Sequence, residues 1–187
     1  MTRFEHFSVL ISIVIGLGVT QLLLNVYQLI QARERLRAYW LPIFWTCVLF
    51  VAMVEWWWYL WDIRAHTEGW NFFYFMFVLM SPVTLYMAAA FALPEPRDNE
   101  VTDLREYYYR NHAYFFAMVA AGPALDSIRR GIESGSFTDL GAVTNAISAV
   151  LVGSLAFTRN ARYHVLISLI VTALFSYFIL AAALHLN

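Results

Sequence analysis

Lysine does not occur in this sequence of 187 residues, cysteine occurs once, and charged side chains make up only 13% of the chain. The single cysteine, Cys47, excludes an intrachain disulfide, and its apolar surroundings predict a buried packing residue. The formal net charge of −1 argues against the polybasic surface that a site for nucleic acid needs. The sequence also lacks a catalytic signature, a nucleotide-binding loop and a complete metal motif. It therefore gives no direct sign of an enzyme.

Apolar residues are abundant instead. They make up 61% of the chain and form six blocks, each close to the ~20 residues with which an α-helix crosses a bilayer. The blocks cover residues 9–30, 41–61, 72–93, 107–128, 140–157 and 165–184. The fourth is the weakest, because its apolar core is too short to span alone and must recruit flanking residues. We predict an all-α fold: one polytopic transmembrane helix bundle over residues 1–187, with six spans and no soluble domain.

The twelve basic residues are all arginines, and their distribution predicts an orientation. Eight follow the first, third and fifth blocks. The other four precede the first block or follow the second and fourth blocks. The larger group comprises Arg33, Arg35, Arg37, Arg97, Arg105, Arg110, Arg159 and Arg162. By the positive-inside rule these arginines face the cytoplasm, so both termini are expected on the non-cytoplasmic side. A bacterial inner membrane is the simplest location.

The first predicted helix has two unlike faces. One face carries small residues at every fourth position, namely Ser8, Ser12, Gly16 and Thr20. Such stripes let transmembrane helices approach closely, so this face is predicted to be a packing seam. The roughly opposite face carries the carboxamides Gln21, Asn25 and Gln28, which need partners away from lipid. Two such faces on one helix predict a homo-oligomer that associates through this helix.

Charged side chains within the predicted spans are the sharpest pointers to function, because charge in hydrocarbon is costly without a partner or a water path. Glu55 is the clearest of them, about two turns inside the outer end of the second block. The topology brings other polar residues to a similar depth: Glu5, His6, Asp126, Asn145 and His185. A purely structural explanation exists for Asp126, which is spaced to form an i, i+4 ion pair with Arg130.

These residues predict a channel or transporter for a small cation or a proton, with a polar site in the outer leaflet. The binding residues would be Glu55, Glu5, His6, Asp126, His185, Gln21, Asn25 and Asn145. One alternative is an accessory or scaffold subunit that packs against another membrane protein. A second is a cofactor-binding membrane enzyme, for example with haem held between His112 and His164. We assign no catalytic residue, cofactor or metal ligand from the sequence.

Overall fold

The computed structural model describes residues 3–63, 71–96 and 101–185. Six α-helices account for most of these residues: α1 (Arg3–Gln31), α2 (Trp40–Ile63), α3 (Phe72–Ala92), α4 (Leu104–Ser134), α5 (Leu140–Ser154) and α6 (Ala161–His185). The connections hold the 3-10 helices η1 (Arg33–Arg35) and η3 (Leu155–Phe157) and the two-residue strands β1 (Leu36–Arg37) and β2 (Thr102–Asp103). The strands pair in parallel. The all-α class predicted from the sequence is confirmed.

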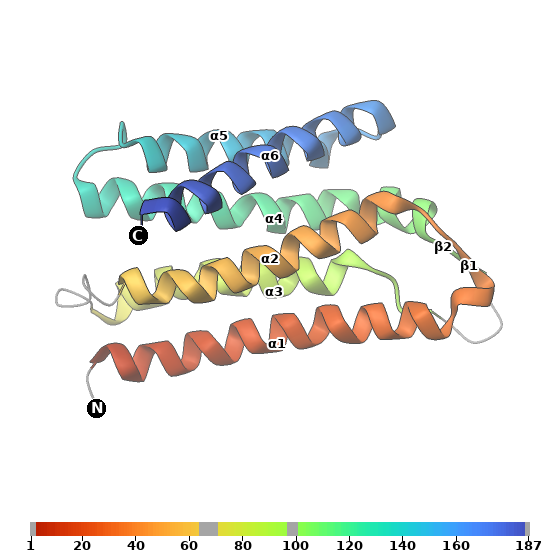
Figure 1. The fold of residues 1–187 in the computed structure, drawn as a ribbon, viewed down its shortest axis with the longest axis horizontal. Helices are drawn as coiled ribbons and strands as arrows, with labels where there is room; N and C mark the ends of the chain where they lie inside the picture. The colour runs from red at the N-terminus through yellow and green to blue at the C-terminus, as the bar shows by residue number, and fades with distance from the viewer. Residues whose placement is uncertain (1–2, 64–70, 97–100, 186–187) are drawn as a thin grey trace.

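The helices run side by side in alternating directions (Figure 1). In space the order α1, α3, α4, α5 makes one series of neighbours, and α2 and α6 pack against it. The start of α1 and the end of α6 lie at the same end of the bundle (Figure 1). The other end carries η1, β1 and the beginnings of α4 and α6, where the described members of the larger arginine group lie. We call it the arginine-rich end.

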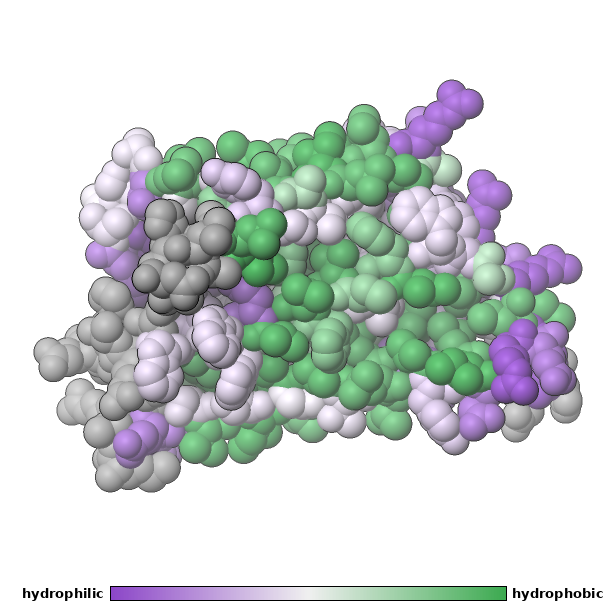
Figure 2. Space-filling view, in the orientation of Figure 1, coloured by the Kyte–Doolittle hydropathy of each residue, from purple (hydrophilic) through white to green (hydrophobic). Residues whose placement is uncertain are grey.

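Five segments are long and apolar enough to cross a membrane: α1, α2, α3, α5 together with η3, and α6. One face of the molecule carries a broad apolar band across its middle, with hydrophilic side chains at the arginine-rich end (Figure 2). This banding is what a bilayer requires, because hydrocarbon cannot solvate polar side chains whereas the two interfaces can. The five apolar segments and the apolar band are both compatible with an integral membrane protein.

The weakly apolar α4 lies between α3 and α5, which are its most extensive neighbours. That place explains its composition, since polar side chains on a helix within a membrane protein are tolerated when other helices cover them. Several polar residues of α4 are indeed buried, among them His112 and Arg129. With 31 residues α4 measures about 46 Å at the usual rise per residue, which exceeds the hydrocarbon thickness.

Side chains fix where three of the helices begin. Asp103 accepts hydrogen bonds from the amides of Arg105 and Glu106, at 2.9 and 3.1 Å, and thereby starts α4. Asn71 caps α3 and Asp139 caps α5 in the same way. α4 ends at Gly135, whose φ of 68° is the left-handed conformation that glycine adopts without strain. The helix boundaries are thus set locally by the sequence.

The structure uses the two faces of α1 unequally. Gly16 of the small-residue stripe is exposed, and a Cβ there would meet no described atom within 4 Å. The close approach occurs at Gly18, where a Cβ would lie 2.8 Å from Cε of Met53 and 3.5 Å from Cα of Tyr86. The carboxamide face packs inward, with Asn25 only 1% exposed. The prediction that Cys47 is buried is wrong, because its side chain is exposed on α2.

Candidate functional site

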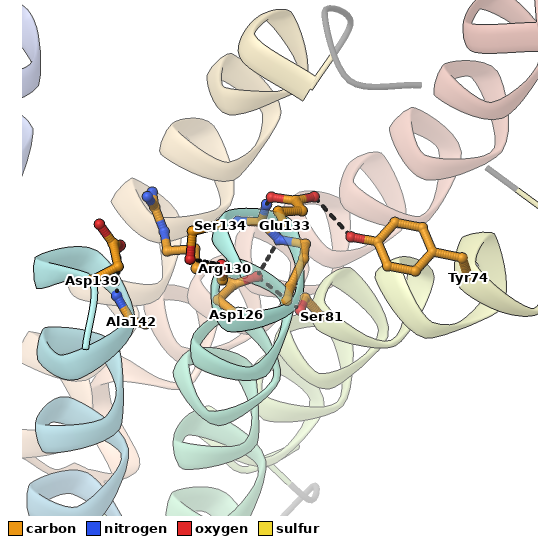
Figure 3. Close-up of polar contacts among 9 residues, drawn as sticks. Tyr74, Ser81, Asp126, Arg130, Glu133, Ser134, Asp139 and Ala142 are labelled. Carbon is orange, nitrogen blue, oxygen red and sulfur yellow. Dashed lines mark hydrogen bonds and ion pairs between the residues drawn. The ribbon is translucent and has the colours of Figure 1, made fainter. Parts of the chain in front are cut away.

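The main concentration of buried charge in the described part of the chain lies in the C-terminal half of α4. Asp126, Arg129 and Glu133 follow one another at intervals of three and four residues, which places them on one face of the helix. Tyr74 and Ser81 reach them from α3, as Figure 3 shows, and Tyr59 from α2 lies against the arginine. We call these six residues the acid–arginine cluster.

Arg129 is the centre of the cluster, and its side chain is only 3% exposed. Its Nη1 lies 2.7 Å from Oε2 of Glu133, and its Cζ lies 4.9 Å from the ring centre of Tyr59. The other carboxylate oxygen of Glu133, Oε1, accepts a hydrogen bond of 2.8 Å from the hydroxyl of Tyr74. A buried guanidinium is tolerated only when it is compensated in this way. Arg129, Glu133 and Tyr74 therefore form a fixed clamp between α3 and α4.

Asp126 is held much less tightly than Glu133. Its Oδ1 accepts the Ser81 hydroxyl at 3.3 Å and lies 3.5 Å from Nε of Arg129, both at the long end of hydrogen-bonding distance. Its side chain keeps 22% of its surface accessible. Asp126 stands eight residues before the end of α4, which is about 12 Å along the helix. It is thus an internal carboxylate with weak contacts and partial access.

Arg130 does not form the ion pair with Asp126 that the sequence suggested. The ion-pair partner of Asp126 is Arg129, three residues along the helix instead of four. Like Arg129, Arg130 lies near the ring of Tyr59, with its Cζ 5.6 Å from the ring centre, and its Nη1 approaches Gly141 at the start of α5. The pairing depends on how α4 is rotated against α2 and α3, which helical spacing alone does not specify.

The other predicted outer-site residues lie on other helices. Glu55 has an exposed side chain on α2, and the acid–arginine cluster is built without it. Glu5 and His6 are exposed in the first turns of α1, and Asn145 is half-buried on α5. His185 ends α6, and its side chain lies outside the described residues. Of the predicted acids and histidines, Asp126 alone belongs to the cluster as we define it, and a role for the others stays a prediction.

The carboxamides of α1 form a separate polar contact. Nε2 of Gln21 donates to Oδ1 of Asn25 at 2.9 Å, and Nδ2 of Asn25 donates to the backbone carbonyl of Ala89 at 3.1 Å. Ala89 lies in the last turn of α3, where carbonyls lack a partner within the helix. Gln21 and Asn25 therefore tie α1 to the end of α3, whereas Oε1 of Gln28 is buried without a hydrogen-bond partner.

A second buried polar group lies toward the arginine-rich end. Nε2 of His164 is 2.8 Å from the carbonyl of Thr158, so this nitrogen donates; in the neutral imidazole Nδ1 then accepts the Tyr108 hydroxyl, also at 2.8 Å. The ring centres of His112 and His164 are 6.0 Å apart, so the two histidines are neighbours, as a shared haem would require. Both nitrogens of His164 are already used, however, and Phe116 packs on its ring. These residues do not fit a haem.

The described residues contain no group of three or more histidine, cysteine or acidic side chains placed to hold a metal ion. The chain matches no protein-family model, no curated protein and no solved structure. The argument for function therefore depends on the geometry of its own side chains.

Sequence reasoning missed four members of the cluster: Tyr59, Tyr74, Ser81 and Glu133. Glu133 was within reach, because it follows Arg129 by one helical turn on the face that carries Asp126. Tyr74 and Ser81 are seven residues apart and so share a face of α3. Which face of α3 meets α4 is a tertiary property that these spacings do not reveal.

Proposed function

We propose that this protein is a membrane transporter or channel for protons or another small cation, and that Asp126 is the group that exchanges the ion. The observation that carries the proposal is that Arg129 binds one of its two acidic partners more closely than the other. Glu133 is bound at 2.7 Å and Asp126 at 3.5 Å. Asp126 can therefore take up a proton, or turn toward a cation, while Arg129 keeps its ion pair with Glu133.

Charged and titratable groups face Asp126 from three helices. They are Arg129, Arg130 and Glu133 on α4 itself, Tyr59 on α2 and Tyr74 on α3. The arginines, the tyrosines and Glu133 are held in place by contacts with one another. A proton on Asp126 would therefore alter two contacts of its own, with the hydroxyl of Ser81 and with Nε of Arg129. Few contacts change when the ion is exchanged, as turnover requires.

The proposal is tested with purified protein in liposomes that carry a pH-sensitive dye. Wild-type protein should dissipate an imposed pH gradient, and Asp126→Asn, which cannot ionise, should not. If both dissipate the gradient at the same rate, Asp126 is not the group that exchanges the ion, and if both leave it as long-lived as in protein-free vesicles, the transport function is excluded. A scaffold subunit in a complex with another membrane protein then becomes the better proposal.

We further propose that the arginine-rich end faces the cytoplasm of a bacterial cell, with both termini on the outer side of the inner membrane. The arginine asymmetry supports this orientation. Single-cysteine variants at Glu34 and Asn187, made in a Cys47→Ser background, test it in intact cells. A membrane-impermeant maleimide should label position 187 and leave position 34 unlabelled; the reverse pattern contradicts the orientation.

Self-association through α1 completes the proposal, because Gly16 of its small-residue stripe is exposed and open. Gly16→Leu should separate a homo-oligomer into monomers without changing the thermal stability of the fold, since position 16 is open. Gly18→Leu is the matched control and should instead lower the free energy of unfolding by about 1–3 kcal/mol, because Met53 and Tyr86 fill that space. Native mass spectrometry and thermal melting separate the two effects. A wild-type monomer in both mild detergent and nanodiscs rules the oligomer out.

A further inference from the structure

An open depression of about 470 Å³ lies at the arginine-rich end, far along α4 from Asp126. Three arginines, two acids and one tyrosine line it: Asp103, Arg105, Glu106, Tyr109, Arg110 and Arg159. Five of these come from the beginning of α4 and the residue before it, and Arg159 comes from the connection between η3 and α6. Segments more than forty residues apart thus bring positive charge to one hollow.

The two acids in the depression are already engaged. Asp103 caps α4 with two hydrogen bonds and lies 3.9 Å from Nη1 of Arg37, and Glu106 pairs with Arg110 at 4.0 Å. Within the described part of the chain, no carboxylate lies at ion-pair distance from Arg105 or Arg159. The guanidinium of Arg105 is placed instead by Tyr39, whose ring centre is 5.8 Å from Cζ. Two guanidinium groups are therefore available to an anion.

Exposed aromatic side chains follow or precede the lining arginines closely in the sequence. Phe157, two residues before Arg159, is 91% exposed, and Tyr114, one turn beyond Arg110, is 65% exposed and stacks on Phe91. Tyrosine is enriched at the boundary between headgroups and acyl chains in membrane proteins, and an exposed phenylalanine suits contact with acyl chains. The arginines consequently stand at headgroup depth with apolar surface beside them, an arrangement that suits an amphiphile better than a free anion.

We propose that this depression binds the headgroup of an anionic phospholipid, with the phosphate held by Arg105 and Arg159. A guanidinium offers paired donors that match phosphate oxygens, and basic pockets between membrane helices bind acidic headgroups by this chemistry. The lipid's acyl chains would lie over Phe157 and Tyr114. The depression is separate from the acid–arginine cluster, so this proposal is independent of the transport function.

Native mass spectrometry of the purified protein in non-ionic detergent tests the proposal, with phosphatidylglycerol, phosphatidylethanolamine and phosphatidylcholine added in equal amounts. Wild-type protein should retain phosphatidylglycerol preferentially. Arg105→Gln and Arg159→Gln should each weaken that retention about fivefold, and the double variant about twentyfold. A double variant at Arg33 and Arg162, two exposed arginines that do not line the depression, removes the same charge and should bind as wild type does.

Equal retention of the three lipids, or equal loss in both double variants, overturns the proposal, because general attraction to positive charge would then explain the binding. The source of the phosphate is tested with glycerol 3-phosphate at millimolar concentration. It should leave bound phosphatidylglycerol in place; if it displaces the lipid, the depression is a site for a soluble phosphate and the lipid assignment fails.

Discussion

Replacing Arg129 by methionine is expected to lower the free energy of unfolding by about 3–5 kcal/mol. The change removes the positive charge that Asp126 and Glu133 share, and it leaves the partly buried carboxylate of Asp126 inside the bundle without its ion-pair partner. It also removes the guanidinium that lies on the ring of Tyr59. Titration with dodecyl sulfate in mixed micelles, followed by the fluorescence of the seven tryptophans, measures the loss.

Two further variants show whether charge is the cause. Arg162→Met removes an exposed arginine and should change stability by less than about 0.5 kcal/mol. A triple variant, Asp126→Asn, Arg129→Met and Glu133→Gln, removes all three charges and should recover most of the loss, since an uncompensated buried charge costs more than a neutral core. A loss below about 1 kcal/mol for Arg129→Met alone would contradict the role of Arg129 as a compensated buried charge.

The positions of the helices could be predicted from sequence because burial in a bilayer requires long apolar runs. The predicted block 41–61 became α2 (Trp40–Ile63) and 72–93 became α3 (Phe72–Ala92). Block 107–128 was the uncertain one, and α4 extends beyond it at both ends, to Leu104 and Ser134. Capping by Asp103 and the left-handed Gly135 fix those ends, and both are local signals.

The rotation of each helix about its axis was much harder to predict. α2 is apolar around its whole circumference, so its sequence does not distinguish the exposed Cys47 from the buried Leu49. On α1 both Gly16 and Gly18 could permit close packing, and only the neighbours Met53 and Tyr86 select Gly18. The same limitation applies to the candidate site: Asp126 was recognised by its type and depth, whereas its partners depend on which faces of α3 and α4 meet.

Asp126→Asn is expected to abolish pH-driven proton flux in liposomes and to leave the fold intact. Asparagine keeps an acceptor oxygen for Ser81 and for Arg129, and the two contacts it must replace are long, at 3.3 and 3.5 Å. The Arg129–Glu133 pair is untouched, so stability should change by no more than about 1 kcal/mol. Thermal melting of the same preparations separates a loss of flux from a loss of structure.

Three companion variants locate the exchanging group. Asp126→Glu keeps a carboxyl at the position and should retain proton flux. If Asp126 had a purely structural role, Asp126→Glu would instead lose flux as Asp126→Asn does. Glu34→Gln removes an exposed acid at the arginine-rich end and should behave as wild type does. Glu55→Gln tests the acid that the sequence emphasised. If Glu55→Gln alone abolishes flux and Asp126→Asn does not, ion exchange occurs on the exposed face of α2, and the assignment to the acid–arginine cluster is wrong.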